Sequence, residues 1–409
     1  MTLLVPSIWP DEGGERKLSD ESFRVSELAV RRPGDVMRHQ YVDARAFAQL
    51  IRETRPDVVD IHEEAFSVLS HQALALLPRD VPVVMYAAQN IDKRLPPPFS
   101  GYERVAHRRV ASYYPCSRQA ASRLRGTGFA GLIEVLPLGY EEAMFTAGSQ
   151  SLDADELVIM IVGRLIPEKG IDDAVRVLAG VNAFRPARLV VSGRGPEEER
   201  ARNVAAWLGV TDRVEFVGWQ SGPALAASYR RTHVVLVPSR PSTVAEQFGR
   251  VIVEAQAAGA VVAGYACGAI AEVAGAAAIV VPTGDVGRLG ELVTRLLCDP
   301  DEFAGRREEG RTQSAGRTWE SVARAQVALY ERVLADPLPD LALPRSPLRR
   351  RSIARAEFGQ TAVASGGIRP FALPILRRGG PLPRVLGAMV DAMAEVLHSC
   401  RLARERSTE

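Results

Sequence analysis

Cysteine is scarce in this chain of 409 residues. The four that occur are widely separated: Cys116, Cys267, Cys298 and Cys400. None forms a Cys-x-x-Cys pair or a Cys/His cluster with the spacing of metal ligands. The sequence therefore gives no support for a disulfide framework or a structural zinc site, and a reduced cytoplasmic setting is the simplest interpretation.

An excess of charge of one sign is also missing. Lys and Arg number 51 and Asp and Glu number 49, so the net charge is +2 and gives no electrostatic case for nucleic acid as the principal partner. No run of eighteen apolar residues predicts a transmembrane helix. The start of the chain lacks the charged-then-apolar pattern of a secretion signal. We expect a cytoplasmic protein, for which contact with the cytosolic face of a membrane stays open.

What the sequence does contain is a regular alternation of apolar strand-like runs and segments with helical periodicity, in two successive sets. The length suffices for two or three domains with ample cores. This pattern predicts an α/β fold with two doubly wound domains, whose site lies at the carboxyl ends of their strands.

Residues 234–259 read V-V-L-V-P-S-R-P-S-T-V-A-E-Q-F-G-R-V-I-V-E-A-Q-A-A-G. The apolar run at 234–237 predicts a buried strand, and the two prolines that follow predict an extended loop. Gly249 stands before a segment with apolar residues at helical spacing, and Gly259 is a typical helix stop. The stretch therefore predicts a strand, a loop and a helix.

The start of that helix is a candidate anion site. Backbone amides near Phe248, Gly249 and Arg250 would lack helical partners, and the helix dipole adds positive potential there. A diphosphate fits such a place. Glu254, about 6–9 Å further along the axis, would then face ribose hydroxyls, and Glu246 would face a sugar on the other side. The alternative is a pair of surface glutamates that flank an ordinary core helix.

The segment E-Q-F-G-R-V-I-V-E-A-Q-A-A-G resembles the E-x7-E signature of retaining glycosyltransferases of family four, which have the GT-B fold. The resemblance extends over most of residues 1–333. It implies transfer of a sugar, with retention of configuration, from a UDP- or GDP-linked donor to a glycan, lipid or small-molecule hydroxyl acceptor. It implies no cofactor.

A second motif, G-R-L-I-P-E-K-G, resembles the family pattern G-R-L-x-x-x-K-G and contains Arg164 and Lys169. Two cations from one loop beside the helix start would neutralise a diphosphate in place of a metal, whereas taken alone they would be ordinary surface residues. The central stretch at 234–259 has no D-x-D pattern, so we expect no metal requirement. The resemblance also places donor-binding backbone at Gly193, in a G-x-G-P turn, and at Val217, where relatives hold the base. A tight turn would explain the glycines of the G-x-G-P segment without a ligand.

Three residues of the N-terminal half are candidates by the same resemblance. His62 ends a short predicted strand where relatives have acceptor-side groups, although a histidine satisfied at a sheet edge explains it equally well. Gln89, or its neighbour Asn90, takes the place of a histidine that contacts the sugar in many relatives, and an amide cannot act as a general base near neutral pH. Gly139, in a segment similar to P-x-G-V-D-x-x-x-F, would allow close approach of a ligand.

The apolar run at 2–5 resembles the second strand of the family, so the chain is expected to lack the first strand-loop-helix unit. We predict four regions: an acceptor-side domain at 1–147, a nucleotide-sugar domain at 148–317, a cross-over helix at 318–336, and a Pro/Arg-rich linker with a candidate amphipathic helix at 337–409.

The favoured interpretation is a metal-independent retaining glycosyltransferase in which Glu246, Arg164 and Lys169 are the catalytic residues. Two alternatives stay open. A nucleotide-sugar epimerase of the same architecture would need no acceptor. A catalytically inactive nucleotide-sugar-binding protein would agree with the shortened first domain and with Gln89.

Overall fold

A computed structural model describes residues 2–7, 24–241 and 245–335. The chain divides into two compact units, Met1–Arg94 with Tyr102–Asp340, and Leu95–Gly101 with Leu341–Glu409. Of the second unit only Leu95–Gly101 is described, and all the strands named below belong to the first. The linker and amphipathic helix predicted at 337–409 lie outside the described residues.

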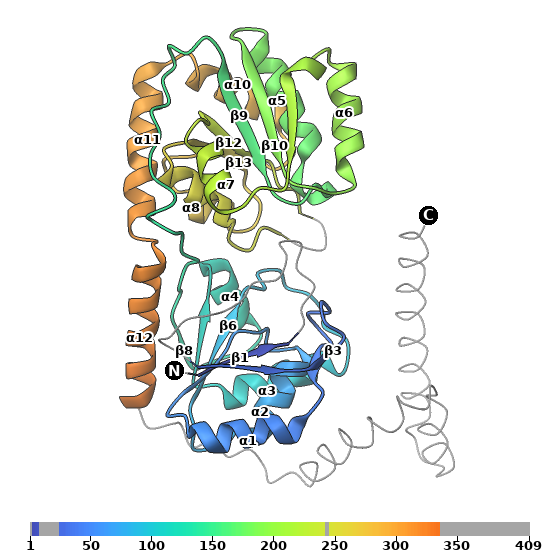
Figure 1. Ribbon diagram of the computed structural model, residues 1–409, viewed down its shortest axis with the longest axis vertical. Coiled ribbons are helices and arrows are strands. Elements are labelled where there is room, and N and C mark those ends of the chain that lie inside the picture. Colours follow the sequence, from blue (N-terminus) through green and yellow to red (C-terminus); the bar gives the residue numbers. More distant parts are fainter. Residues whose placement is uncertain (1, 8–23, 242–244, 336–409) are drawn as a thin grey trace, which may run out of the picture. The chain divides into compact units, whose positions relative to one another are not determined.

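The N-terminal half contains a parallel four-stranded sheet in the order β5-β6-β7-β8. The strands of this half of the chain are β1 (Thr2–Pro6), β2 (Arg24–Leu28), β3 (Val30–Arg31), β4 (Gln40–Tyr41), β5 (Val59–Ile61), β6 (Val83–Ala87), β7 (Ser112–Pro115) and β8 (Leu132–Ile133). Its helices are α1 (Ala44–Thr54), α2 (Val68–Leu76), α3 (Phe99–Arg109) and α4 (Arg118–Gly126) (Figure 1). Strands β1 and β2 form a parallel pair, and β3 and β4 form an antiparallel pair.

The C-terminal half contains a parallel six-stranded sheet. Its strands are β9 (Leu157–Val162), β10 (Ala187–Ser192), β11 (Val214–Gly218), β12 (Val234–Val237), β13 (Val261–Tyr265) and β14 (Ile279–Val281). Its helices are α5 (Ile171–Asn182), α6 (Glu197–Trp207), α7 (Gly222–Tyr229), α8 (Arg250–Ala257), α9 (Ile270–Ala274), α10 (Val286–Leu296), α11 (Pro300–Ala315) and α12 (Trp319–Ala335), with short 3-10 turns at Pro167–Lys169 and Thr211–Arg213.

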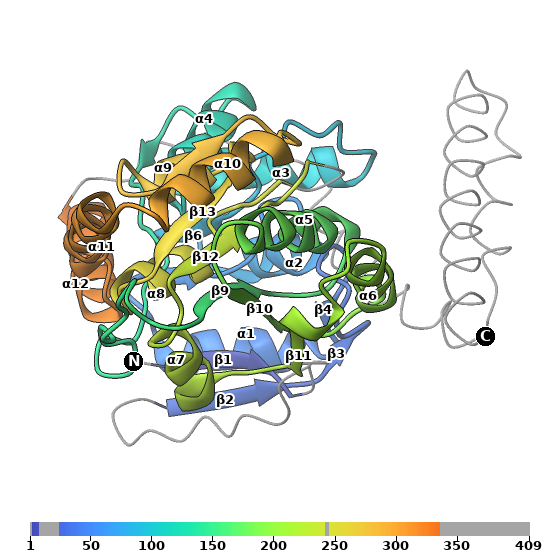
Figure 2. The ribbon, with the colours of Figure 1, turned by 90° about the horizontal axis from the view of Figure 1, so that it is seen from above.

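The strand order of this second sheet is β11-β10-β9-β12-β13-β14, which is the order of the doubly wound nucleotide-binding fold. Strands β9 and β12 are buried along almost their whole length, as expected for strands covered on both faces. Helices α5 and α10 pack together over one face, and α8 and α11 pack together over the other (Figure 2). The predicted α/β architecture is confirmed.

Helix α12 completes the core of the N-terminal sheet. Its Leu329 and Val333 pack against Val84 and Tyr114 of that sheet. The carboxylate of Asp60 accepts hydrogen bonds from Gln326 Nε2 at 2.6 Å and from Tyr330 Oη at 2.5 Å. The Tyr114 hydroxyl donates to the second oxygen of Asp60 at 2.6 Å. This half-buried carboxylate has three donors, and it joins the last described helix to the first sheet.

The segment at 147–156, at the boundary between the two predicted domains, is hydrogen-bonded to the second sheet domain. Gln150 Nε2 donates to the carbonyls of Tyr229 and Ala258 at 3.2 and 3.1 Å. The guanidinium of Arg307 donates to the carbonyls of Gly148 and Gln150 at 3.0 and 2.9 Å. The segment therefore has fixed partners along its first residues. Among the described residues, no helix has both the length and the apolar composition needed to cross a membrane.

Candidate active site

The carboxyl ends of β9 and β12 lie side by side at the centre of the six-stranded sheet. The strand order reverses at this pair, and open α/β sheets bind their ligands at such a switch point. The loop after β9 carries Lys169, and the loop after β12 carries Glu246. Two motifs that are far apart in the sequence therefore leave the sheet at the same place.

The carboxylate of Glu246 joins these two loops. Its Oε2 accepts hydrogen bonds from Lys169 Nζ at 2.6 Å and from Ser239 Oγ at 3.2 Å. The side chain of Lys169 is 27% exposed and that of Glu246 is 14% exposed, so a ligand can reach the pair. Ser239 is buried and was not among the predicted residues. Its one sequence signal is its place just beyond the end of a buried strand, at the edge where ligands bind.

The main chain of Glu246 is fixed from two directions. Its carbonyl accepts hydrogen bonds from Asn90 Nδ2 at 2.8 Å and from the amide of Ala269 at 2.9 Å. A Cβ atom at Gly268 would lie 2.1 Å from the same carbonyl oxygen, and Gly268 has a φ of +60°, so only glycine fits. These contacts set the direction of the Glu246 carboxylate before any ligand arrives.

Helix α8 begins at Arg250, as predicted, and Gly249 is its N-cap in the left-handed conformation with a φ of 80°. Among the described residues no side chain caps this helix start, and Gly249 has none to offer, so the amides of Arg250 and Val251 stay available to an acceptor. The side chain of Phe248 is buried in the core, so Phe248 can offer a ligand only its main chain. The anion site at this helix start stays a prediction.

Glu254 lies further along α8 and is buried with two partners. Arg250 Nε lies 2.9 Å from Oε1, and the Tyr229 hydroxyl donates to Oε2 at 3.4 Å. Burial raises the pKa of Glu254, and Arg250 and Tyr229 offset only part of this. A ribose at the helix start would meet Glu254 only after the exposed guanidinium of Arg250 moves aside.

Arg164 differs from Lys169, its predicted companion. Its side chain is exposed. Within the described ranges it forms no ion pair, whereas Lys169 is bound to Glu246. Of the two predicted cations, Lys169 is therefore bound to the loop that precedes α8, and Arg164 faces the solvent.

The glycine turn after β10 is explained by packing between neighbouring loops. A Cβ atom at Gly193 would lie 1.8 Å from the carbonyl oxygen of Gly163, and the Gly193 amide donates to Gly218 at 2.8 Å. This glycine is required even without a ligand, so its presence does not by itself locate a donor. Val217 lies next to this turn in β11, is partly exposed, and stands at the irregularity in the pairing of β10 with β11.

The space over Gly139 is filled by the chain itself, which corrects the prediction of a ligand there. A Cβ atom at Gly139 would lie 2.7 Å from the Trp319 ring and 2.8 Å from its Cα. The next residue, Tyr140, exchanges main-chain hydrogen bonds with Arg317 and Trp319, both at 3.1 Å. Glycine is needed here because the start of α12 packs directly on it.

His62 follows β5, stacked on Tyr86 with ring centroids 4.2 Å apart. Its Nδ1 lies 3.3 Å from the Tyr114 hydroxyl. The side chain is exposed, so it can also meet a ligand. Both interpretations of His62 are therefore compatible with the geometry.

The loop after β6 is ordered by Glu64, whose Oε1 accepts hydrogen bonds from the amides of Ala88 and Gln89 at 2.9 and 2.8 Å. Burial raises the pKa of Glu64. The Gln89 side chain accepts from the Ile91 amide at 3.2 Å and so completes a turn within its own loop. Of the two amide side chains considered for the sugar side, Asn90 is the one that donates to the Glu246 carbonyl.

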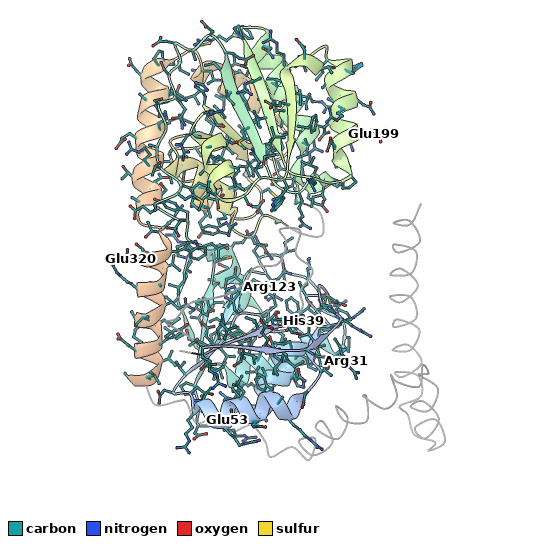
Figure 3. The ribbon with its side chains drawn as sticks, in the orientation of Figure 1. Arg31, His39, Glu53, Arg123, Glu199 and Glu320 are labelled. Carbon is teal, nitrogen blue, oxygen red and sulfur yellow. The ribbon has the colours of Figure 1, made fainter. Side chains whose placement is uncertain are left out.

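Arg123 of α4, labelled in Figure 3, supports the same loop. Its Nε donates to the carbonyl of Ile91 at 3.2 Å, and a terminal nitrogen lies 2.7 Å from Glu103 of α3. Both side chains of this ion pair are almost fully buried. The pair therefore fixes the loop of Gln89 and Asn90 against two helices.

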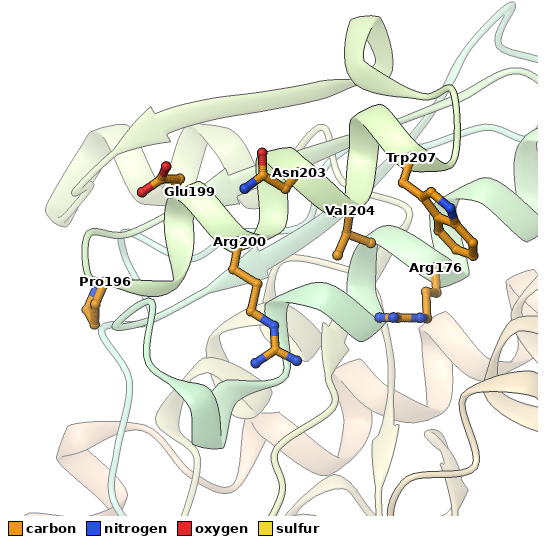
Figure 4. A pocket seen from close by; sticks show the side chains of 7 residues that line it. All are labelled: Arg176, Pro196, Glu199, Arg200, Asn203, Val204 and Trp207. Carbon is orange, nitrogen blue, oxygen red and sulfur yellow. The ribbon is translucent and has the colours of Figure 1, made fainter.

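Within the described residues, no group of three or more His, Cys, Asp or Glu side chains is placed to hold a metal ion. A cavity of about 600 Å³ lies beside α5 and α6, lined by Arg176, Arg200 and Trp207 among others (Figure 4). None of the predicted site residues lines it, and both arginines are paired with Asp172. This cavity is separate from the loop that carries Glu246.

The two parallel sheets and their covering helices define an α/β protein with two Rossmann-like domains. Residues 4–143 match the family model described as Glycosyltransferase Family 4, and residues 146–313 match the one described as Glycosyl transferases group 1. The chain belongs to the glycosyltransferases with the GT-B fold, of the family-four type.

Two curated relatives show the range of this similarity. The D-inositol 3-phosphate glycosyltransferase of Mycobacteroides abscessus is 33% identical over 217 residues, which cover 50% of this chain and 47% of the relative. The 2-deoxystreptamine glucosyltransferase of Streptomyces kanamyceticus is 33% identical over 181 residues, which cover 43% and 46%. The chain spans about half the length of the curated relatives it matches.

Solved structures confirm the predicted GT-B fold. Sucrose-phosphate synthase from Thermosynechococcus elongatus superposes with a TM-score of 0.64 at 19% identity, over 82% of this chain and 89% of that one. Anabaena HepE in complex with UDP superposes with a TM-score of 0.62 at 16% identity, over 76% and 86%. At these identities the likeness shows the fold alone.

Proposed function

We propose that this chain transfers a hexosyl group from a UDP- or GDP-linked sugar to a hydroxyl acceptor, with retention at the anomeric carbon and without a metal ion. The observation that carries the proposal is the Lys169–Glu246 pair, 2.6 Å apart, at the switch point between β9 and β12. It places a cation beside an uncapped helix start.

This arrangement suits departure of a nucleoside diphosphate. Breaking the glycosidic bond puts negative charge on the leaving diphosphate, and preorganised cations and amides stabilise that charge. Lys169 and the first amides of α8 take this role, with Arg164 as a second cation. Glu246 orients the transferred sugar, and Glu254 orients the ribose once Arg250 has moved.

The activities for which two relatives are named support the acceptor class. One acts on D-inositol 3-phosphate and one on 2-deoxystreptamine, and both compounds are polyhydroxylated rings. We therefore propose a polyol or sugar hydroxyl as the acceptor of this chain.

Incubation with single UDP- and GDP-sugars tests the proposal. The acceptor panel contains inositol phosphates, aminocyclitols and sugars. The expected product is a glycoside whose anomeric configuration, read by NMR, equals that of the donor. Arg202→Ala, on the exposed face of α6, is the matched control for Lys169→Ala. Inverted product would overturn retention, and isomerised donor without acceptor would identify an epimerase.

An inactive binding protein is the second candidate, favoured by one observation. The amide side chain of Gln89 caps a turn in its own loop, so it offers no base to an acceptor. Nucleotide binding by calorimetry without transfer or hydrolysis across the panel would establish this candidate and overturn the transferase.

A further inference from the structure

Two neighbouring carboxylates are buried at the start of α5. Asp172 and Asp173 lie in the first turn of this helix and are 5% and 6% exposed. The helix dipole favours negative charge there, but two adjacent buried acids still need cations or donors close by. This cluster is not part of the site described above.

Arg240 binds both of these acids with one guanidinium. Its Nε donates to Asp173 Oδ2 at 3.1 Å, and one terminal nitrogen donates to Asp172 Oδ1 at 2.9 Å. The buried hydroxyl of Tyr265, the last residue of β13, donates to Asp173 Oδ2 at 2.7 Å. Burial opposes the charge of Arg240, yet the two aspartates leave its pKa raised. The cluster therefore holds the Arg240 side chain in a single orientation.

The main chain of Arg240 ties the same two loops together. Its amide donates to the carbonyl of Glu168 at 2.7 Å. Beside it, a Cβ atom at Gly170 would lie 2.3 Å from the carbonyl oxygen of Pro238. The loop after β9 and the loop after β12 thus contact each other along their main chains. The guanidinium of Arg240, bound to Asp172 and Asp173, connects this contact to α5.

Each of the two donors to Glu246 is a sequence neighbour of one of these contacts. Ser239 precedes Arg240, and Lys169 follows Glu168. Both donate to Glu246 Oε2, at 3.2 and 2.6 Å. We propose that Arg240, held by Asp172, Asp173 and Tyr265, is a positioning residue that sets the geometry of Lys169 and Ser239 on Glu246. This inference rests on the proposed function, in which those groups act on the donor.

A guanidinium bound to two carboxylates suits a positioning role better than an apolar contact does. Buried ion pairs contribute little net stability, because desolvation offsets their attraction, but their geometry is specific. Arginine presents planar donors that lysine cannot reproduce. Two other arginines also reach Asp172: Arg176 at 3.3 Å and Arg200 at 3.2 Å. Both come from helices, and neither is in the loop that carries Ser239, so they provide matched controls.

The test compares Arg240→Gln, Arg240→Lys and Tyr265→Phe with Arg200→Gln. Since displaced catalytic groups slow chemistry more than binding, we expect kcat to fall about 10- to 100-fold in Arg240→Gln. The affinities for UDP and GDP, measured by calorimetry, should fall by a smaller factor than kcat, because Lys169 is displaced and not removed. Arg240→Lys should recover part of kcat, Tyr265→Phe should cost about two- to fivefold, and Arg200→Gln should match wild type.

Hydrogen exchange gives a readout that does not depend on turnover. The amides of Lys169 and Gly170 donate to Ile166 and Pro167 at 2.9 and 3.3 Å. They should exchange faster in Arg240→Gln and not in Arg200→Gln. Equal kcat in these two variants, in an active wild type, would overturn the positioning role. Equal exchange would overturn the loop linkage. A wild type that acts on no nucleotide sugar would instead overturn the proposed function.

Discussion

Lys169 and Glu246 form an ion pair whose atoms Nζ and Oε2 lie 2.6 Å apart, although the residues belong to loops that follow different strands. An ammonium group has three donors. Lys169 can therefore keep its bond to Glu246 while it donates to a diphosphate. In the proposed mechanism, the pair links the group that meets the leaving phosphate to the group that meets the sugar.

Replacing Lys169 by alanine should lower kcat about 10²- to 10³-fold, the usual effect of losing one preorganised donor to developing charge. The melting temperature should change by no more than about 2–4 °C, equivalent to about 1 kcal/mol, because the pair is partly exposed. Steady-state kinetics and calorimetric melting measure the two effects. Turnover at the level of the Arg202→Ala control would contradict the diphosphate role.

Replacing Glu254 by glutamine should weaken UDP or GDP binding about 10- to 100-fold, since a hydrogen bond to a charged acceptor contributes about 1.5–3 kcal/mol. Glutamine keeps the size of the side chain and can still accept from Tyr229. Isothermal calorimetry with the free nucleotide measures the effect. An affinity equal to that of wild type would remove Glu254 from the ribose site.

The same substitution should change how stability depends on pH. Burial raises the pKa of Glu254 above its ordinary value of 4.5, despite Arg250 and Tyr229. The folded protein then holds this proton more tightly than the unfolded chain. The resulting stability is present below the unfolded pKa and is lost as pH rises through the folded pKa. Melting curves between about pH 4 and 7 should show Glu254→Gln gaining on wild type as pH rises. A constant difference between the two proteins would contradict the raised pKa.

Transfer activity should survive a chelator, because Lys169 and helix amides stabilise the leaving diphosphate in the proposed mechanism. Initial rates with and without EDTA, after dialysis against it, measure this. The Arg202→Ala control is treated in the same way. If both proteins lose activity in EDTA and regain it with magnesium, the metal-free scheme is overturned.

Gly268→Ala should destabilise the protein by about 2 kcal/mol or more, through its positive φ and the clash with the Glu246 carbonyl. Activity should fall with it, since that carbonyl anchors the catalytic loop. Gly180→Ala in α5 is the matched control. Nothing lies within 4 Å of a Cβ atom there, and the helix should gain about 0.5–1 kcal/mol. Chemical denaturation measures both, and equal stabilities would contradict the assigned packing.

The elements around the site follow closely from sequence pattern. The apolar run at 234–237 is strand β12 with the predicted bounds. Helix α8 runs from Arg250 to Ala257, and Gly259 follows its C-cap with a φ of +82°. Their signals are local: continuous apolar runs bounded by glycine or proline. The pairing of Lys169 with Glu246 follows because the carboxyl ends of parallel strands share one edge of a sheet.

The remaining features depend on partners that no local pattern reveals. Gly193 and Gly139 are both required by backbone or side chains of distant segments, Gly163 and Trp319. A glycine in a loop reports close approach but not what approaches. Ser239 and Arg240 carry no motif of their own, and their roles are visible only once α5 and β13 are in place beside them.

Asp60 draws two of its hydrogen bonds from Gln326 and Tyr330, so the last described helix is a component of the first domain. An N-terminal fragment that ends at the boundary between the two halves would lack α12. Val84 and Tyr114 would then be exposed, and Asp60 would lose two hydrogen-bond donors. Chimeras built to exchange acceptor preference with a relative would need to carry Trp319–Ala335 along with the N-terminal half. A synthetic peptide of that helix should bind and solubilise the fragment made alone.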